Sequence, residues 1–147
     1  MSECAAVRPP ARQSCPPLTW ERTYPGRTEQ ASQVRAALRA FLAGYPAADT
    51  AVLLASELAA NAIAHSASGQ PGGTFTVRTQ IHNGACIHAQ VEDQGSGWDG
   101  QISAARSPHG LYLVRHLSAA CGTQRGPHGW TAWFTIGPPA TGPAPQP

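Results

Sequence analysis

The chain has 147 residues, a length that fits a single folded domain around one hydrophobic core. Its formal net charge of +2 is too small to mark a surface for nucleic acid, so direct binding to nucleic acid is not expected. All ten basic residues are arginine, which excludes a P-loop lysine and Schiff-base chemistry. A nucleotide would therefore have to be held in another way.

The two ends of the chain are poor in core-forming residues. Residues 1–17 contain four prolines, and residues 137–147 are mostly Pro, Ala and Gly, which predicts two disordered tails. The folded domain is therefore expected over residues 18–136. No apolar run reaches the ~18 residues needed to cross a bilayer, and the cysteines show no zinc-ligand spacing. These features predict a cytoplasmic protein with reduced thiols and no membrane partner.

In the first half of the domain we expect one strand followed by two helices. Leu18 to Tyr24 reads as a short strand, after which Pro25-Gly26 turns the chain. Thr28 is predicted to cap a helix that ends at Leu42. Asp49 is predicted to cap a second helix that runs to Ala64 or His65.

In the second half we expect a hairpin, a helix and a second hairpin. Asn83-Gly84 between two β-rich runs is a strong hairpin signal. The elements expected here are strands Thr74–His82 and Ala85–Val91, a helix Gly110–Ala119, and a strand pair that turns around Arg125–Gly129 and ends in Trp130–Ile136. The order of elements predicts an α+β two-layer sandwich, in which helices cover one face of a mostly antiparallel sheet.

The second helix carries an unusual polar stripe. Residues four apart lie about 40° from each other on a helix, so Glu57, Asn61 and His65 share one face. The other residues from Ala51 to Ala64 are aliphatic except for one serine, so the helix is expected to be buried on most sides. An unpaired polar group away from water costs roughly 2–7 kcal/mol. The stripe therefore needs partners, which are either a bound ligand or an arginine and backbone groups of the protein itself.

A glycine-rich acidic loop follows the strand that ends near Val91. The strand alternates apolar and polar residues and delivers Asp93 at its end. A carboxylate here can accept a hydrogen bond from the amine of adenine or guanine, and Gly95 and Gly97 let the backbone approach a flat ring. The alternative is a plain surface turn, because Asp and Gly are common turn residues.

The stripe and the loop together resemble a known superfamily. The segments SELAANAIAH (Ser56–His65), VEDQGSG (Val91–Gly97) and GLYLV (Gly110–Val114) are similar to those of the gyrase, histidine-kinase and mismatch-repair (GHKL) ATPases. More narrowly, the chain resembles the bacterial anti-sigma-factor serine kinases. The resemblance implies a Bergerat-type ATP-binding fold, ATP and Mg²⁺ as cofactors, a sigma factor and an anti-anti-sigma antagonist protein as partners, and a homodimer.

The resemblance also implies a role for each matched residue. Glu57 would polarise the attacking hydroxyl or water, and Asn61 would bind Mg²⁺ through its amide oxygen. Asp93 would hold the adenine amine. The other expected contacts to the nucleotide come from Gly95, Gly97, His109, Gly110, Leu111 and Thr131, with the phosphates near the N-terminus of the helix that starts at Gly110.

One segment departs from the family pattern. The family usually has Gly-Arg-Gly-Leu where this chain has Pro108-His109-Gly110-Leu111, and Pro108 offers no amide to a phosphate. Two functions are therefore retained: a serine/threonine kinase that phosphorylates an antagonist protein and sequesters a sigma factor, and a nucleotide-sensing module without phosphate transfer. A third hypothesis is a partner-binding domain that needs no ATP. The helix Thr28–Leu42, with Arg35 and Arg39, is a candidate contributor to partner binding.

Overall fold

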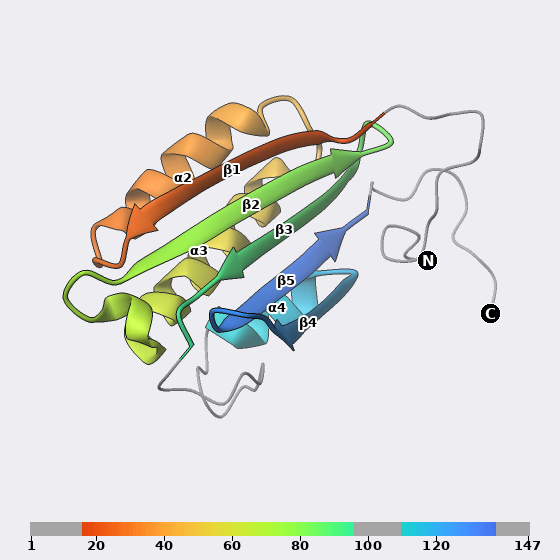
Figure 1. Cartoon of the computed structure of the whole chain (residues 1–147). Coiled ribbons are helices and arrows are strands. Elements are labelled where there is room, and N and C mark those ends of the chain that lie inside the picture. The colour runs from red at the N-terminus through yellow and green to blue at the C-terminus, as the bar shows by residue number, and fades with distance from the viewer. Residues whose placement is uncertain (1–15, 96–109, 138–147) are drawn as a thin grey trace.

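The sheet and its helices form two layers in the computed structural model, which describes residues 16–95 and 110–137 (Figure 1). Five strands form one antiparallel sheet in the order β1-β2-β3-β5-β4. The strands are β1 (Leu18–Pro25), β2 (Thr74–His82), β3 (Cys86–Glu92), β4 (Ala120–Arg125) and β5 (Trp130–Ile136). The predicted α+β fold is confirmed.

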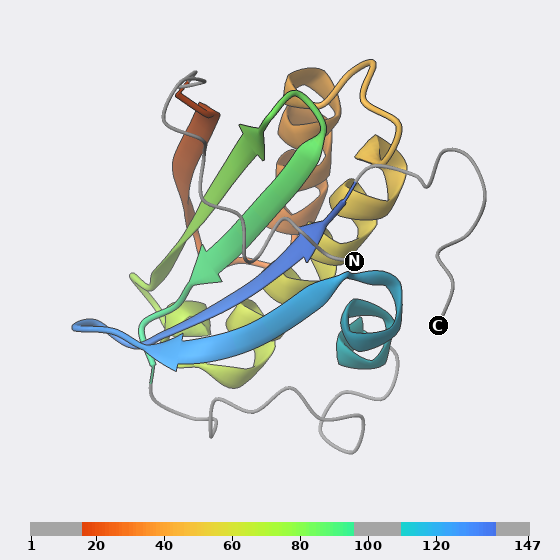
Figure 2. The same ribbon diagram turned by 90° about the vertical axis from the view of Figure 1, so that its right-hand side faces the viewer.

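The helices cover one face of the sheet (Figures 1 and 2). They are α2 (Gln30–Phe41), α3 (Ala48–His65) and α4 (Gly110–Leu117), and a short 3-10 helix, η1 (Ala67–Gly69), follows α3. Within the described residues the opposite face of the sheet carries no helix. The predicted tails, residues 1–17 and 137–147, lie outside the described part of the chain except for residues 16, 17 and 137.

The β2–β3 hairpin forms as predicted, because its turn suits the residues there. Asn83 has a φ of 54° and Gly84 a φ of 76°, and these are the positive angles that a tight hairpin turn needs. His82 then pairs with Cys86, so β3 starts one residue later than expected. The hairpin aligns the alternating residues of β3, so that Ile87, Ala89 and Val91 are buried.

The predicted helix caps are wrong in both cases. The residue at the N-cap of α2 is Glu29 rather than Thr28, and it makes no side-chain capping bond. Helix α3 starts after Ala47, so Asp49 lies inside its first turn. There the carboxylate still interacts favourably with the helix dipole, which explains why the sequence signal placed it near the helix start.

The core lies between α3 and the sheet. Leu54, Phe75, Ile87 and Phe134 are fully buried there, and α3 packs against β3, α2 and α4. Because three elements surround it, α3 has no broad solvated face, and the expectation that it is buried on most sides is confirmed. None of the helices in the described ranges is long and apolar enough to span a membrane.

The cysteines differ from expectation at one position. Cys86, the first residue of β3, is disulfide-bonded, whereas Cys121 on β4 is free. The prediction of reduced thiols is therefore wrong for Cys86.

Candidate functional site

Asp93 leaves the end of β3 and is held in one orientation by backbone amides. Its side chain is 3% exposed, and its Oδ1 accepts hydrogen bonds from the backbone N–H of Gly95 (2.7 Å) and of Trp130 (3.1 Å). The Asp93 N–H in turn donates to the Trp130 carbonyl (2.9 Å). A buried carboxylate with two amide donors is a built feature of the fold, so the alternative of a plain surface turn is excluded.

Two glycines let the Asp93 loop cross the start of β5. Gly95 has a φ of 86°, and a Cβ built on it would lie 2.8 Å from the Gly129 Cα. A Cβ on Gly129 would lie 2.3 Å from the Asp93 carbonyl oxygen, closer than real Cβ atoms come. Both positions therefore require glycine for the close approach of two backbones. Sequence reasoning assigned Gly95 to the nucleotide, and the structure gives it this further packing role.

A chain of serine and glutamine contacts ties the end of α3 to the Asp93 loop. Ser66 Oγ donates to the Ala62 carbonyl (2.7 Å) and accepts from the Ser68 N–H (3.0 Å). Ser68, fully buried, accepts from the Gln94 N–H through its Oγ (3.0 Å). Gln94 Oε1 then accepts from the Thr74 N–H at the start of β2 (3.0 Å).

Sequence reasoning missed these supporting residues. In the sequence, the two serines that follow the helix, Ser66 and Ser68, could have indicated these contacts, because serine side chains there commonly bond to nearby backbone groups. The consequence for the site is rigidity, because the loop that carries Asp93 is anchored to α3 on one side and to β5 on the other.

The polar stripe of α3 is most buried at its central residue, Asn61. Asn61 is 7% exposed, Glu57 is partly buried and His65 is exposed. Figures 1 and 2 show the last turns of α3 and the end of β3 at the same end of the molecule. Among the described residues no arginine forms an ion pair with Glu57, since the pair present joins Arg78 Nε and Glu21 Oε1 (3.7 Å). The alternative that an arginine satisfies Glu57 finds no support there.

Thr131 does not lie with the other predicted site residues. Ala132 and Phe134 on β5 point into the core, so Thr131 points to the opposite face of the sheet, where it lines a hollow with Trp133. The residue beside Asp93 is Trp130, through its backbone, and the Arg125 guanidinium lies 5.1 Å from the centre of the Trp130 ring.

The predicted phosphate segment is described only in part. Gly97, Pro108 and His109 lie outside the described residues, and so does the side chain of Leu111. Gly110 is the first residue of α4, and α4 packs against α3. Helix α4 therefore lies beside the helix that carries the polar stripe.

The described residues fit the cofactors that the sequence resemblance implies. Asp93 is a fixed carboxylate beside a close backbone approach, which suits the amine edge of a flat base. Asn61 offers a buried amide on an otherwise aliphatic helix, and its oxygen is a suitable single protein ligand for Mg²⁺, which retains waters and takes its other ligands from phosphates.

Comparison with known proteins agrees with this geometry. Residues 24–136 match the family described as the histidine kinase-like ATPase domain. A solved structure of the RsbU and RsbW domains of Rv1364c from Mycobacterium tuberculosis is similar, with a TM-score of 0.65 and 26% sequence identity over 84% of this chain. That match covers 33% of the other chain, so the present chain spans about a third of its length. The curated proteins include no match.

These findings confirm the resemblance to the GHKL ATPases and, within them, to the anti-sigma-factor kinases. The match extends over most of the chain, from the end of β1 to the end of β5. The chain belongs to the histidine kinase-like ATPase domain family.

Proposed function

We propose that this protein is a Mg²⁺-dependent and ATP-dependent serine/threonine kinase that phosphorylates an antagonist protein and sequesters a sigma factor. Family membership supports ATP binding and a regulatory role. The observation that carries the proposal is the anchored Asp93 carboxylate at the end of the molecule where the polar stripe of α3 lies.

In this proposal Asp93 and Gly95 receive the base. Asp93 accepts a hydrogen bond from the exocyclic amine of adenine, and the backbone around Gly95 lies against the ring. Because Asp93 is already oriented by the amides of Gly95 and Trp130, little rearrangement is needed when the nucleotide arrives.

The polar stripe of α3 is proposed to act on the phosphates of ATP. Asn61 holds Mg²⁺ through its amide oxygen, and the cation neutralises charge on the phosphates when it is bound. Glu57 accepts the proton of the serine or threonine hydroxyl of the antagonist as that oxygen bonds to the γ-phosphorus and the bond from this phosphorus to the β-phosphate oxygen breaks. The partial exposure of Glu57 is compatible with this role, because the acceptor hydroxyl must reach it from solvent.

The test separates binding from transfer. Glu57→Ala is expected to leave the Kd for ATP unchanged and to lower the rate of phosphate transfer by roughly 10²–10⁴-fold, the usual contribution of a general base. The control is Glu29→Ala, which removes an exposed glutamate at the N-cap of α2. Transfer from labelled ATP to a candidate antagonist is measured for both variants. Unchanged transfer in Glu57→Ala would remove Glu57 from the mechanism.

A second function is favoured by one sequence observation. Pro108 lacks an amide where the family presents a phosphate contact, and a nucleotide-sensing module without transfer would tolerate that loss. In that case wild-type protein binds Mg²⁺-ATP and forms no phosphoprotein. Asn61→Ala would still weaken the Mg²⁺-dependent part of ATP binding, which distinguishes this function from a domain that needs no nucleotide.

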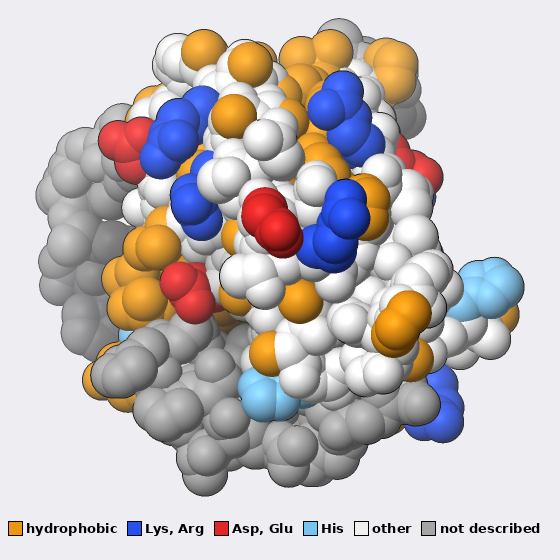
Figure 3. Space-filling view, turned by 90° about the vertical axis from the view of Figure 1, so that its left-hand side faces the viewer, with side chains coloured by type: hydrophobic (Ala, Val, Ile, Leu, Met, Phe, Trp, Pro, Cys, Tyr) orange, Lys and Arg blue, Asp and Glu red, His pale blue; other side chains and the backbone are white. Residues whose placement is uncertain are grey.

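The surface around α2 supports the partner-binding part of the proposal. Figure 3 shows basic side chains spread over the face that lies on the left of Figure 1, with acidic side chains between them. Arg27 before α2 and Arg39 in its last turn are exposed, and Arg35 is partly exposed. None of these three forms an ion pair with a described acidic residue, so they remain available to acidic groups of a partner protein.

A further inference from the structure

The face of the sheet without a helix carries a hollow of about 350 Å³. Strands β2, β3, β4 and β5 line it with three glutamines, two histidines, two threonines and one tryptophan. Among the described residues that line it, none is acidic and none is arginine. The hollow lies on the sheet face opposite to the core, whereas Asp93 and α3 lie on the core side, so it is distinct from the nucleotide site.

One residue of the hollow has an unsatisfied hydroxyl. Thr135 is 3% exposed, and its Oγ1 has no hydrogen-bond partner. Buried polar groups in folded proteins are nearly always paired, so this hydroxyl beside the hollow needs a partner, and a bound ligand is one group that can supply it. Thr79 is also buried without a partner, but it points into the core and lines no hollow.

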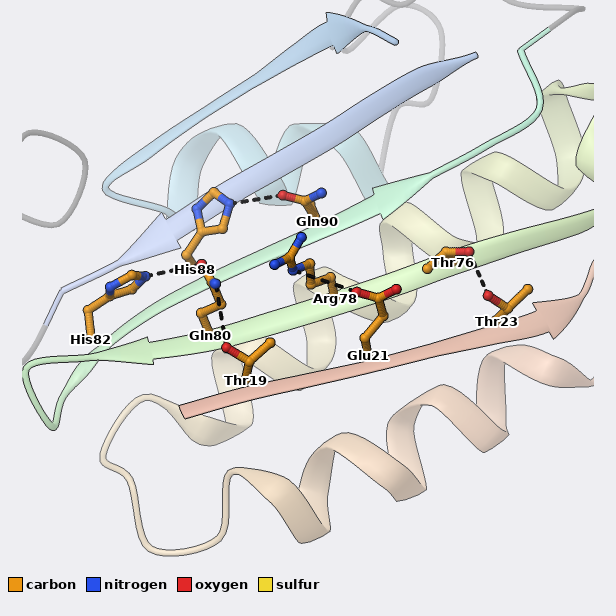
Figure 4. A network of polar contacts seen from close by, with 9 residues as sticks. All are labelled: Thr19, Glu21, Thr23, Thr76, Arg78, Gln80, His82, His88 and Gln90. Carbon is orange, nitrogen blue, oxygen red and sulfur yellow. Dashed lines mark hydrogen bonds and ion pairs between the residues drawn. The ribbon is translucent and has the colours of Figure 1, made fainter. Parts of the chain in front are cut away.

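The side chains that line the hollow around Thr135 are uncharged, and two of them are stacked aromatic rings. The His88 ring stacks on Trp133 with centroids 5.8 Å apart, and Gly122 leaves room for the indole, since a Cβ there would lie 3.1 Å from it. His88 Nε2 is 3.3 Å from Gln90 Oε1, a contact drawn in Figure 4. Burial lowers the pKa of His88 below its ordinary value of 6.5, so this imidazole is uncharged at neutral pH.

The chemistry of these side chains selects one class of ligand. Glutamine amides, threonine hydroxyls and neutral imidazoles both donate and accept hydrogen bonds, as sugar hydroxyls do, and the volume suits a small ring. We propose that this hollow binds the uncharged ring of a sugar, with one ring hydroxyl paired to Thr135 Oγ1. His88 lies opposite Thr135 in the pairing of β3 with β5, so the two side chains are neighbours on the same face of the sheet.

The ring can come from a free monosaccharide or from a nucleoside, and the experiment separates the two. Full-length protein labelled with ¹⁵N is titrated with D-glucose, D-ribose and uridine, without ATP, while the indole N–H signals are followed by NMR. A saturable shift of the Trp133 signal, assigned with Trp133→Phe, is expected with at least one probe. A response to uridine without a response to either monosaccharide assigns the source to nucleosides. No saturable shift with any of the three probes overturns the proposal.

Two matched variants separate binding from a purely structural role. Thr135→Val keeps the size of the side chain and removes the hydroxyl, so it is expected to raise the Tm and to weaken sugar binding at least tenfold. Thr76→Val makes the same change on the same face outside the hollow, where Thr76 Oγ1 bonds to Thr23 Oγ1 (2.8 Å), and should leave sugar binding unchanged (Figure 4). Unaltered affinity in Thr135→Val would overturn the proposal.

Discussion

The two faces of the sheet differ in how their buried polar groups are satisfied. On the core side of the sheet, Asp93 is bonded by two backbone amides, and Gln94 and Ser68 fix the loop around it. On the open face, Thr135 is buried with no partner. Two different features can therefore suggest a binding site. A side chain that the protein already holds in place, such as Asp93, suits a site that needs little rearrangement when its ligand arrives. A buried group without a partner, such as the Thr135 hydroxyl, suits a site in which the ligand supplies the missing hydrogen bond.

The largest expected effect comes from Gly129→Ala, which disturbs the close approach between the Asp93 loop and the start of β5. The new Cβ would lie 2.3 Å from the Asp93 carbonyl oxygen, and this oxygen belongs to the backbone and cannot move freely. We expect a loss of about 1–3 kcal/mol in the free energy of unfolding and a loss of ATP binding. Urea denaturation and nucleotide titration measure the two effects.

The control for this change is in the same hairpin. A Cβ on Gly126 would lie 3.6 Å from the nearest backbone atom, an ordinary contact, so Gly126→Ala should bind ATP normally. Equal behaviour of the two variants would show that the close approach at Gly129 does not govern the site.

Ser68→Ala is expected to have the next largest effect. It leaves the Gln94 N–H without its acceptor, and the loss of this part-buried hydrogen bond costs about 1–1.5 kcal/mol of stability. ATP affinity should fall as well, because the Asp93 loop loses its tie to α3. Ser32→Ala is the control, since the exposed Ser32 hydroxyl bonds only to the Glu29 carbonyl of its own helix start (3.0 Å), and its effect should stay within about 0.5 kcal/mol. Matching stabilities of the two variants would contradict this role of Ser68.

Thr79→Val tests a buried hydroxyl that has no partner and belongs to neither proposed site. Thr79 is fully buried with an unpartnered hydroxyl in the core, so its replacement by valine should stabilise the protein by about 1 kcal/mol. Neither ATP binding nor sugar binding should change, because Thr79 lines neither site. Thermal denaturation gives the stability, and a destabilised variant would mean that the Thr79 hydroxyl has a partner in solution.

The smallest expected effect is a pH dependence from His88. Burial lowers its pKa in the folded protein below the value of 6.5 in the unfolded chain, so the unfolded state binds more protons between these two values. Stability from this residue is therefore complete above pH 6.5 and is lost as the pH falls through the folded pKa. His88→Gln should flatten this part of the stability curve measured by denaturation at a series of pH values. An unchanged slope would contradict the burial effect.

Much of the fold follows from local sequence patterns. The Asn83-Gly84 turn, the alternation along β3 and the apolar surface of α3 were all predicted, because each depends on neighbouring residues. The helix caps at Thr28 and Asp49 were wrong, since capping depends on where the chain enters the helix, and packing decides that. The resemblance named Thr131 as a contact to the nucleotide but did not say on which face of the sheet it lies, because that face is set by register with β3.

The sequence by itself determined the family, and it supplied the residues proposed to carry the chemistry, Glu57, Asn61 and Asp93, because these occur in short segments with a fixed spacing along one helix or one strand end. Only the tertiary structure decided what surrounds them. The amides of Gly95 and Trp130 on Asp93, the tie from Ser68 to Gln94, and the unpaired Thr135 on the open face all depend on contacts between distant segments. A pattern within one segment carries no information about such contacts, since they arise only when the segments pack.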